Sequence, residues 1–269
     1  MRETVLGKDG LCYCKTCGER VERIVYFPML DGSGEYTQKK VRLNCKCDLE
    51  ARANKEQQFQ FEELQKSIHE LQKLSLMDAR LKEIKFDTYE QTVENQKVLE
   101  LSKRYVARFD LMYQKGQGIL FWGDVGTGKS YTAAAIANEL IQRNVSVIMT
   151  SFIKLLASTK RFELEDDDLL ERLNRAKLLI IDDLGAERGT DYALEKVYDI
   201  VDSRYRTGKP MILTTNLDFA DMKRCSDIRY NRIYDRIFEM CYPVKMEGMS
   251  WRKKGAVSKF EEMKKLLEA

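Results

Sequence analysis

The sequence predicts an α/β fold in which helices cover a parallel β-sheet. From about residue 86 onward, five short apolar runs have the length and composition of buried strands, at 118–121, 145–149, 178–181, 211–214 and 243–246. Helical patterns lie between these runs, for example over residues 129–143 and 191–206. Such alternation is typical of a parallel sheet with helices on its faces. We therefore expect one α/β domain over residues 84–269.

The composition leaves room for a small additional module. The chain has 269 residues, of which 43% are hydrophobic, enough for a sizeable core. The net charge of +3 gives no strong attraction of the whole chain to nucleic acid, so any such contact needs a local patch. The first residues have no apolar stretch typical of a secretory signal, and no run is long enough to span a membrane. We expect a cytoplasmic protein without membrane contact.

Two smaller regions are expected before the α/β domain. Residues 1–47 hold five of the seven cysteines, and the stretches 21–30 and 41–43 are expected to pair as a hairpin. Residues 48–83 contain neither Pro nor Gly and predict a helical linker. One face of this helix carries apolar residues at three- and four-residue spacing, namely Phe61, Leu64, Ile68 and Leu71. That face either packs on its own protein or is presented to a partner, and the sequence favours neither.

The cysteines of the first region are spaced for metal binding. Cys14 and Cys17 form one close pair, Cys45 and Cys47 form a second, and Cys12 is a spare. Two short chelating pairs suit a tetrahedral Zn²⁺ site. A module this small has little core of its own, so a metal would supply its stability. We therefore predict a zinc-binding module, in preference to reduced buried thiols or an Fe–S cluster.

A glycine-rich segment after the first predicted strand matches the pattern G-x-x-x-x-G-K-[ST] in full. It reads Gly123-Asp124-Val125-Gly126-Thr127-Gly128-Lys129-Ser130 and is followed by Tyr131 in the predicted helix. In such a P-loop, backbone N–H groups and the helix N-terminus surround the phosphates. Lys129 would reach the β- and γ-phosphates, and the Ser130 hydroxyl would ligate Mg²⁺. The segment predicts binding of ATP with Mg²⁺.

Two further polar strand ends support nucleotide hydrolysis. The run 178–181 continues into Asp182 and Asp183, and we expect this strand to lie beside the P-loop strand. Asp182 would then join the Mg²⁺ shell, and Asp183 would polarise the attacking water. The run 211–214 leads to Asn216, whose amide we expect next to the same water, although asparagine is also a common turn residue.

These motifs together resemble the AAA+ ATPases of the ASCE class of P-loop NTPases. More narrowly, segments 180–188, 202–205 and 214–217 are similar to the DnaC/DnaI-type helicase loaders, in particular to their phage or prophage branch. The likeness covers about residues 84–252, and IstB-like transposition ATPases share most of it. It implies a slow, partner-regulated ATPase that binds the replicative DNA helicase and helps to place it on single-stranded DNA. DnaI-type loaders also carry an N-terminal zinc-binding domain that contacts the helicase.

The resemblance implies roles for further residues. Arg236, with Arg232 as the alternative, matches the segment carrying an arginine finger, which implies self-association through the ATPase domain. Arg236 in a surface ion pair is the competing interpretation. Arg252 matches a sensor-2 arginine that contacts the γ-phosphate within its own chain. Four residues lie where loaders contact single-stranded DNA, namely Lys160, Arg161, Phe162 and Tyr192. A partly exposed loop and a tyrosine that packs in a helix are the competing interpretation.

Two other functions remain open on the sequence alone. An IstB-like transposition helper would share the ATPase core, although such proteins as a rule lack the cysteine module. A nucleotide-gated protein that binds single-stranded DNA would use the same site with incidental turnover. A metabolic P-loop kinase is disfavoured, because nothing in the sequence resembles a substrate-binding lid.

Overall fold

The computed structural model describes residues 3–29, 34–75, 77, 79–162, 166–186 and 190–268. Within its helices, some side chains lie outside the described part, including those of Leu64, Leu71, Lys160, Arg161 and Phe162. The chain divides into two compact units, Met1–Leu64 and Gln65–Ala269.

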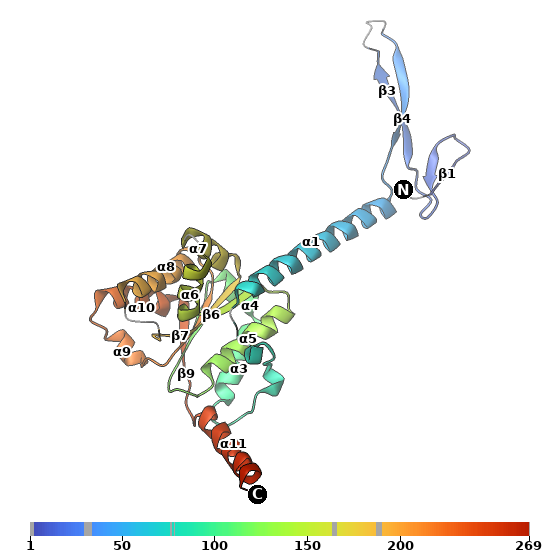
Figure 1. The fold of residues 1–269 in the computed structure, drawn as a ribbon. Helices are drawn as coiled ribbons and strands as arrows, with labels where there is room; N and C mark the ends of the chain where they lie inside the picture. The colour runs from blue at the N-terminus through green and yellow to red at the C-terminus, as the bar shows by residue number, and fades with distance from the viewer. Residues whose placement is uncertain are drawn as a thin grey trace. The chain divides into compact units, whose positions relative to one another are not determined.

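The first unit contains two antiparallel hairpins (Figure 1). Strands β1 (Thr4–Leu6) and β2 (Cys12–Cys14) form the shorter one. Strands β3 (Glu22–Pro28) and β4 (Tyr36–Arg42) form the longer one, with seven paired positions. The longer hairpin is the one expected from the sequence: β3 lies within the expected stretch 21–30, whereas β4 begins earlier than the expected stretch 41–43.

Helix α1 (Lys46–Leu74) is the linker helix predicted from the sequence. In its first part the aromatic side chain of Phe61 is exposed, whereas Ile68 in its second part is buried. Ser75, directly after the helix, donates from its hydroxyl to the Met149 carbonyl (2.9 Å) and accepts from the Met149 N–H (3.1 Å). The second part of the helix therefore packs on the second unit through Ile68, whereas the Phe61 side chain is available to a partner.

The second unit is built on a five-stranded parallel sheet with the order β6-β7-β8-β5-β9. The strands are β5 (Gly118–Trp122), β6 (Val147–Ser151), β7 (Leu178–Leu184), β8 (Met211–Thr215) and β9 (Cys241–Lys245). The α/β fold class and the five strands predicted from apolar runs are confirmed. Continuous apolar runs suit this sheet because helices bury both of its faces.

The expected position of β7 beside the P-loop strand was wrong. Strand β8 lies between β5 and β7 and pairs with both of them. The apolar pattern of a strand does not predict which strands lie beside it. Each of these strands is buried on both faces, so each could pair with either neighbour. The carboxyl ends of all three strands still lie at one edge of the sheet, so the site residues at those ends are brought together.

Two layers of helices cover the sheet (Figure 1). One core joins side chains such as Ile119 and Phe121 to α2 (Ala79–Lys82), η1 (Phe86–Thr88), α3 (Gln96–Ala107), α4 (Phe109–Gln114) and α5 (Lys129–Gln142). The other core joins Leu120 to α6 (Phe152–Phe162), α7 (Asp166–Arg175), α8 (Asp191–Thr207), α9 (Phe219–Lys223) and α10 (Ile228–Met240). Helix α11 (Trp251–Leu267) follows β9. Among the described helices, none has the length and apolar character needed to cross a bilayer.

Arg204 of α8 is a fully buried cation that ties three elements together. Its guanidinium donates to the carbonyls of Ala176 (3.0 Å), Lys177 (3.3 Å) and Pro210 (2.7 Å). Burial lowers the pKa of the guanidinium to about 10. The charge is tolerated because carbonyls surround it, and these carbonyls depend on it in turn. Arg204 thereby fixes the chain entry into β7 and β8.

We expect Arg204→Met to lower the free energy of unfolding by about 2–4 kcal/mol, because buried carbonyls lose a charged donor. Chemical denaturation measures the change. Arg206→Met is the matched control: Arg206 lies two residues along the same helix, its side chain is 74% exposed, and its ion-pair partner Asp202 keeps a second ion pair with Arg236. Its effect should stay within about 0.5 kcal/mol. Equal effects of the two changes would contradict the role of Arg204.

Candidate functional site

The P-loop between β5 and α5 has a backbone that only glycine accommodates well. Gly123 and Gly126 have φ angles of 133° and 87°. A Cβ atom on Gly126 would overlap the hydroxyl of Ser250, and one on Gly123 would overlap the carbonyl of Met246. The glycines therefore allow the residues before α11 to pack directly on the loop.

Lys129 lies inside the loop that it is predicted to serve. Its ammonium donates to the carbonyl oxygens of Gly123 and Asp124, both at 2.7 Å. Burial lowers its pKa, and the nearby carboxylates of Asp183 and Asp124 act in the opposite direction. A buried cation held only by carbonyls is placed to exchange them for phosphate oxygens, which carry full charge.

The acidic end of β7 lies beside this lysine. Burial and the neighbouring Asp182 raise the pKa of Asp183, while Lys129 and Arg252 lower it. Thr214 on β8 donates from its hydroxyl to Asp182 Oδ1 at 2.6 Å. Two carboxylates and two cations are therefore gathered at one edge of the sheet, as a site for a polyphosphate and a divalent cation requires.

The remaining predicted residues surround the same edge. Ser130 is half-buried in the first turn of α5, and Asn216 is exposed directly after β8. Arg252 is exposed in the first turn of α11. The Trp251 N–H donates to the Gly126 carbonyl at 3.0 Å, which fixes the start of α11 against the P-loop.

A cavity of about 230 Å³ next to the P-loop was not predicted from the sequence. Its lining residues are Thr88, Tyr89, Glu90, Gly128, Tyr131 and Trp251. Aromatic walls of this kind suit the flat face of a nucleobase. The cavity combines residues far apart in the chain, so local motifs gave no signal for it beyond the position of Tyr131 directly after the loop.

The two candidate finger arginines have different surroundings. Arg236 is 24% exposed in its side chain, forms an ion pair with Asp202 (2.7 Å) and donates to the Tyr198 hydroxyl (3.1 Å). Arg232, one turn earlier on α10, is exposed and has no ion-pair partner among the described residues. It lines a surface hollow of about 330 Å³ together with Arg229.

Three of the four predicted DNA-binding residues lie at the end of α6, and the fourth lies at the start of α8. The side chains of Lys160, Arg161 and Phe162, at the end of α6, lie outside the described part. Tyr192 is 44% exposed in the first turn of α8, and the ammonium of Lys196 lies 5.5 Å from the centre of its ring. An exposed aromatic ring beside a cation is suited to contact a nucleobase and a phosphate.

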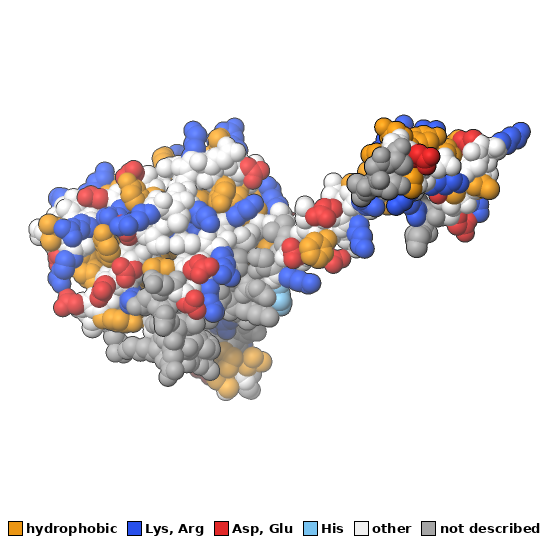
Figure 2. Space-filling view, turned by 90° about the horizontal axis from the view of Figure 1, so that it is seen from above, with side chains coloured by type: hydrophobic (Ala, Val, Ile, Leu, Met, Phe, Trp, Pro, Cys, Tyr) orange, Lys and Arg blue, Asp and Glu red, His pale blue; other side chains and the backbone are white. Residues whose placement is uncertain are grey.

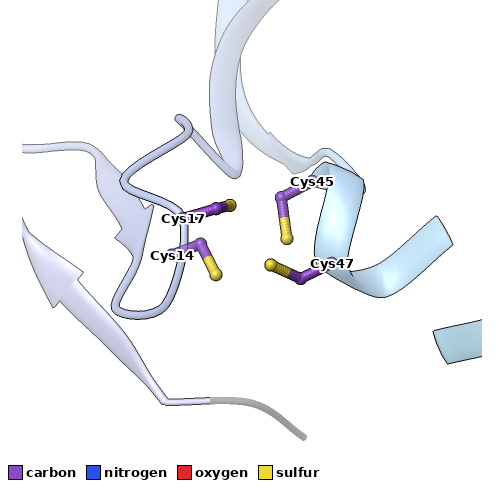
Figure 3. A group of neighbouring side chains, drawn as sticks. All are labelled: Cys14, Cys17, Cys45 and Cys47. Carbon is purple, nitrogen blue, oxygen red and sulfur yellow. The ribbon is translucent and has the colours of Figure 1, made fainter. Parts of the chain in front are cut away.

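The four paired cysteines of the first unit lie together, as predicted. The sulfur atoms of Cys14, Cys17, Cys45 and Cys47 all lie within 4.8 Å of one another. Figure 3 shows the four side chains pointing toward a common centre, one pair from the end of β2 and the turn after it, the other from the start of α1. Cys12 packs against this group without joining it.

The donor set fits a zinc ion. Four thiolates at Zn–S distances of about 2.3 Å would have sulfur–sulfur separations of about 3.8 Å, so only a small contraction is needed. Backbone N–H groups of Cys17 and Thr16 lower the pKa of the Cys14 thiol to about 6, whereas burial raises the pKa of the Cys45 thiol to about 12. Cys14 therefore favours the thiolate form that binds metal, and Cys45 would lose its proton as the metal binds. The residues thus satisfy the number, type and spacing that a structural zinc site requires.

The fold and the loop define the class of the protein. A five-stranded parallel sheet, a P-loop before α5 and an acidic end of β7 characterise an ATP-binding P-loop protein. The chain belongs to the family of IstB-like ATP binding proteins, whose match covers residues 35–258.

The relatives of the chain include phage and replication proteins. It is 32% identical over 161 residues to the phage-like element PBSX protein XkdC of Bacillus subtilis, a match covering 56% of this chain and 59% of that protein. It is 29% identical over 157 residues to the replicative helicase loader DnaC of Escherichia coli, covering 56% and 62% respectively. The chain thus spans about three fifths of the length of these relatives.

Solved structures share the fold over about two thirds of the chain. The crystal structure of DnaI superposes with a TM-score of 0.54 at 26% identity, covering 65% of this chain and 94% of that one. The crystal structure of the DnaC helicase loader gives 0.55 at 25% identity, covering 63% and 100%. DnaA from Aquifex aeolicus with AMPPCP bound shares the fold, with a TM-score of 0.52 at 21% identity.

Cys12, which lies outside the group of four cysteines, gives a matched control for a test of the metal centre. We expect about one Zn²⁺ per chain in the purified protein, and Cys17→Ser should lose most of it because one of four thiolate ligands is removed. Cys12→Ser should retain it, since that thiol lies outside the group of four. Elemental analysis and a chromogenic chelator measure the metal. A parent protein free of metal, or equal loss in both variants, would overturn the assignment.

Proposed function

We propose that this protein is an ATP-dependent loader that binds a replicative DNA helicase and helps to place it on single-stranded DNA. The observation that carries the proposal is the joint presence of an ATPase core similar to DnaC and DnaI and a four-cysteine unit before it. The matches to XkdC and DnaC cover only 56% of this chain. The proposed role of the first unit therefore depends on the surface of that unit.

ATP hydrolysis would use the charged groups at the carboxyl edge of the sheet. Ser130 and Asp182 would hold Mg²⁺, which neutralises charge on the phosphates. Lys129 and Arg252 would contact the phosphate oxygens, and Asp183 would orient the attacking water with help from the Asn216 amide. The aspartate at position 183 is shorter than the glutamate of many AAA+ proteins, which suits slow turnover in a switch.

The zinc module of residues 1–47 would bind the helicase. The β3–β4 hairpin carries exposed Ile24, Tyr26 and Tyr36 on one face, and the exposed cation Lys40 lies directly opposite Ile24 on that face. Figure 2 shows hydrophobic and basic side chains side by side on this unit. An isolated two-stranded hairpin is marginally stable in water, so a partner covering its apolar side chains would stabilise it.

Self-association through the ATPase domain would complete the nucleotide site. Because Arg236 is held by Asp202 and Tyr198 of its own chain, Arg232 is the better candidate for a residue that enters a neighbouring site. Its exposed guanidinium would neutralise charge on the transferring phosphoryl group. Tyr192, with Lys160, Arg161 and Phe162, would contact single-stranded DNA.

A second candidate function is that of a transposition helper. The family match is itself to IstB-like ATP binding proteins, and it extends over most of the second unit. The ATPase core serves either function equally well. The partner of the cysteine unit therefore decides between them.

Capture of the partner tests the leading proposal. The full chain, immobilised with ATP and Mg²⁺, should retain the purified replicative helicase of its host, and Cys17→Ser should lose this capture because its module no longer folds. Cys12→Ser should capture as the parent does. Nucleotide titration should give equal affinities for all three, since the ATPase unit has its own core. Retention by Cys17→Ser after proven loss of zinc would move the helicase contact elsewhere, and capture of a transposase alone would favour the second candidate.

Mixed assemblies test the assignment of the arginines. We expect Asp183→Asn to bind ATP but to lose about 10²-fold or more in turnover, because the water loses its carboxylate. Arg232→Ala should lose a similar factor, and mixing the two variants should restore part of the hydrolysis, since some interfaces then pair an intact site with an intact arginine. Phosphate release is measured across mixing ratios.

Arg236→Ala is the control variant. It should lower the melting temperature, whereas Arg232→Ala should leave the melting temperature unchanged. Recovery with Arg236→Ala instead of Arg232→Ala would reverse the assignment.

A further inference from the structure

The pairing between β7 and β8 is interrupted at the two site carboxylates. Ile181 pairs with Leu213, but the next pairing joins Leu184 to Thr215, so β7 contains one more residue than β8 across this step. Asp183 lies within the interruption and has a left-handed φ of 56°. A bulge of this kind redirects side chains and leaves backbone groups without their regular partners in the ladder.

Two consecutive threonine hydroxyls replace the missing partners. The hydroxyl of Thr214 accepts from the Asp183 N–H (2.9 Å) and donates to Asp182 Oδ1 (2.6 Å). The hydroxyl of Thr215 donates to the Leu184 carbonyl (2.7 Å). Both threonines are fully buried. Because a hydroxyl has only one proton, the Asp183 N–H fixes Thr214 Oγ1 as an acceptor and its proton is directed at Asp182.

We propose that Thr214 is a positioning residue for the nucleotide site, a role beyond those assigned above. It holds one oxygen of Asp182, which would leave the other oxygen of that carboxylate available to a bound Mg²⁺. At the same time it holds the backbone of Asp183 in its left-handed conformation. One buried side chain on the intervening strand β8 thus sets the orientation of both carboxylates.

The two carboxylates need to be held in place because they are half-buried side by side and carry like charges. Asp182 and Asp183 are consecutive residues near the end of β7, and like charges this close repel each other. A free carboxylate beside another would rotate away, and a non-glycine residue at positive φ would relax to the ordinary region. Hydrogen bonds to ligand groups typically change metal affinity by about 10- to 100-fold when they are removed.

Thr215 gives a control for a merely structural role. Its hydroxyl stabilises the same bulge at Leu184 but contacts neither carboxylate. Thr214→Val and Thr215→Val are nearly isosteric changes that each remove one buried hydroxyl, and both should lower the melting temperature. Only Thr214→Val removes the donor to Asp182, so only this variant should change the dependence of nucleotide binding on Mg²⁺.

The experiment is calorimetric titration of the full chain with ATP at a series of Mg²⁺ concentrations, well below the melting temperature of each variant. We expect Thr214→Val to need about 10-fold or more Mg²⁺ for half of the Mg²⁺-dependent gain in affinity. ATP affinity without Mg²⁺ should stay at the parent level. Thr214→Ser keeps the hydroxyl and should need the same Mg²⁺ concentration as the parent. Thr215→Val should also need the same Mg²⁺ concentration as the parent.

The outcomes separate this inference from the proposal of ATP hydrolysis on which it rests. A parent-like Mg²⁺ requirement in Thr214→Val would overturn the positioning role, as would an equal change in Thr215→Val or a failure of Thr214→Ser to restore it. If the parent binds ATP with Mg²⁺ but releases no phosphate, the proposed hydrolysis fails, while the effect of Thr214 on Mg²⁺ is still measured in binding.

Discussion

The half-buried carboxylates at the end of β7 are the constraint around which the ATPase unit is organised. Burial and mutual repulsion raise the pKa of Asp183, and the cations Lys129 and Arg252 offset part of that cost. Each cation comes from a different element, α5 in one case and α11 in the other. A parallel sheet supplies this geometry because the carboxyl ends of its strands meet at one edge. The closeness of α11 to the P-loop, allowed by Gly126, follows from the same requirement.

Much of the second unit could be predicted, because its strands and loop are encoded locally. The P-loop pattern and the apolar runs gave the five strands and the start of α5. The order of the strands could not be predicted in the same way, since β7 and β8 have the same buried character and exchange places without changing any periodicity. The consequence was specific: the strand beside the P-loop carries Thr214, whose contact with Asp182 has no signal in a local motif.

In the first unit, the spacing of the cysteines predicted which side chains lie together, whereas the apolar spacing of the linker helix did not predict what that helix contacts. Two short cysteine pairs predicted the group of four and left Cys12 out, because chelation depends on sequence distance. The linker was harder, since an apolar face alone does not name its partner. Ile68 is buried and Phe61 is exposed on what the sequence presents as one face. The difference arises from tertiary contacts such as that of Ser75 with Met149, which no helical pattern contains.

The arginines of α10 show why a matching motif does not by itself assign a role. Arg236 fits the family segment better than Arg232, yet it is paired with Asp202 and stacked on Tyr198, 4.9 Å from its ring centre. To act on a neighbouring site, Arg236 would have to give up its ion pair with Asp202 and its hydrogen bond to the Tyr198 hydroxyl, although Asp202 would keep its ion pair with Arg206. Arg232 is exposed and has no such contact to give up among the described residues. The free energy of leaving the ion pair, more than the spacing of the motif, therefore favours Arg232 as the residue that reaches a second subunit.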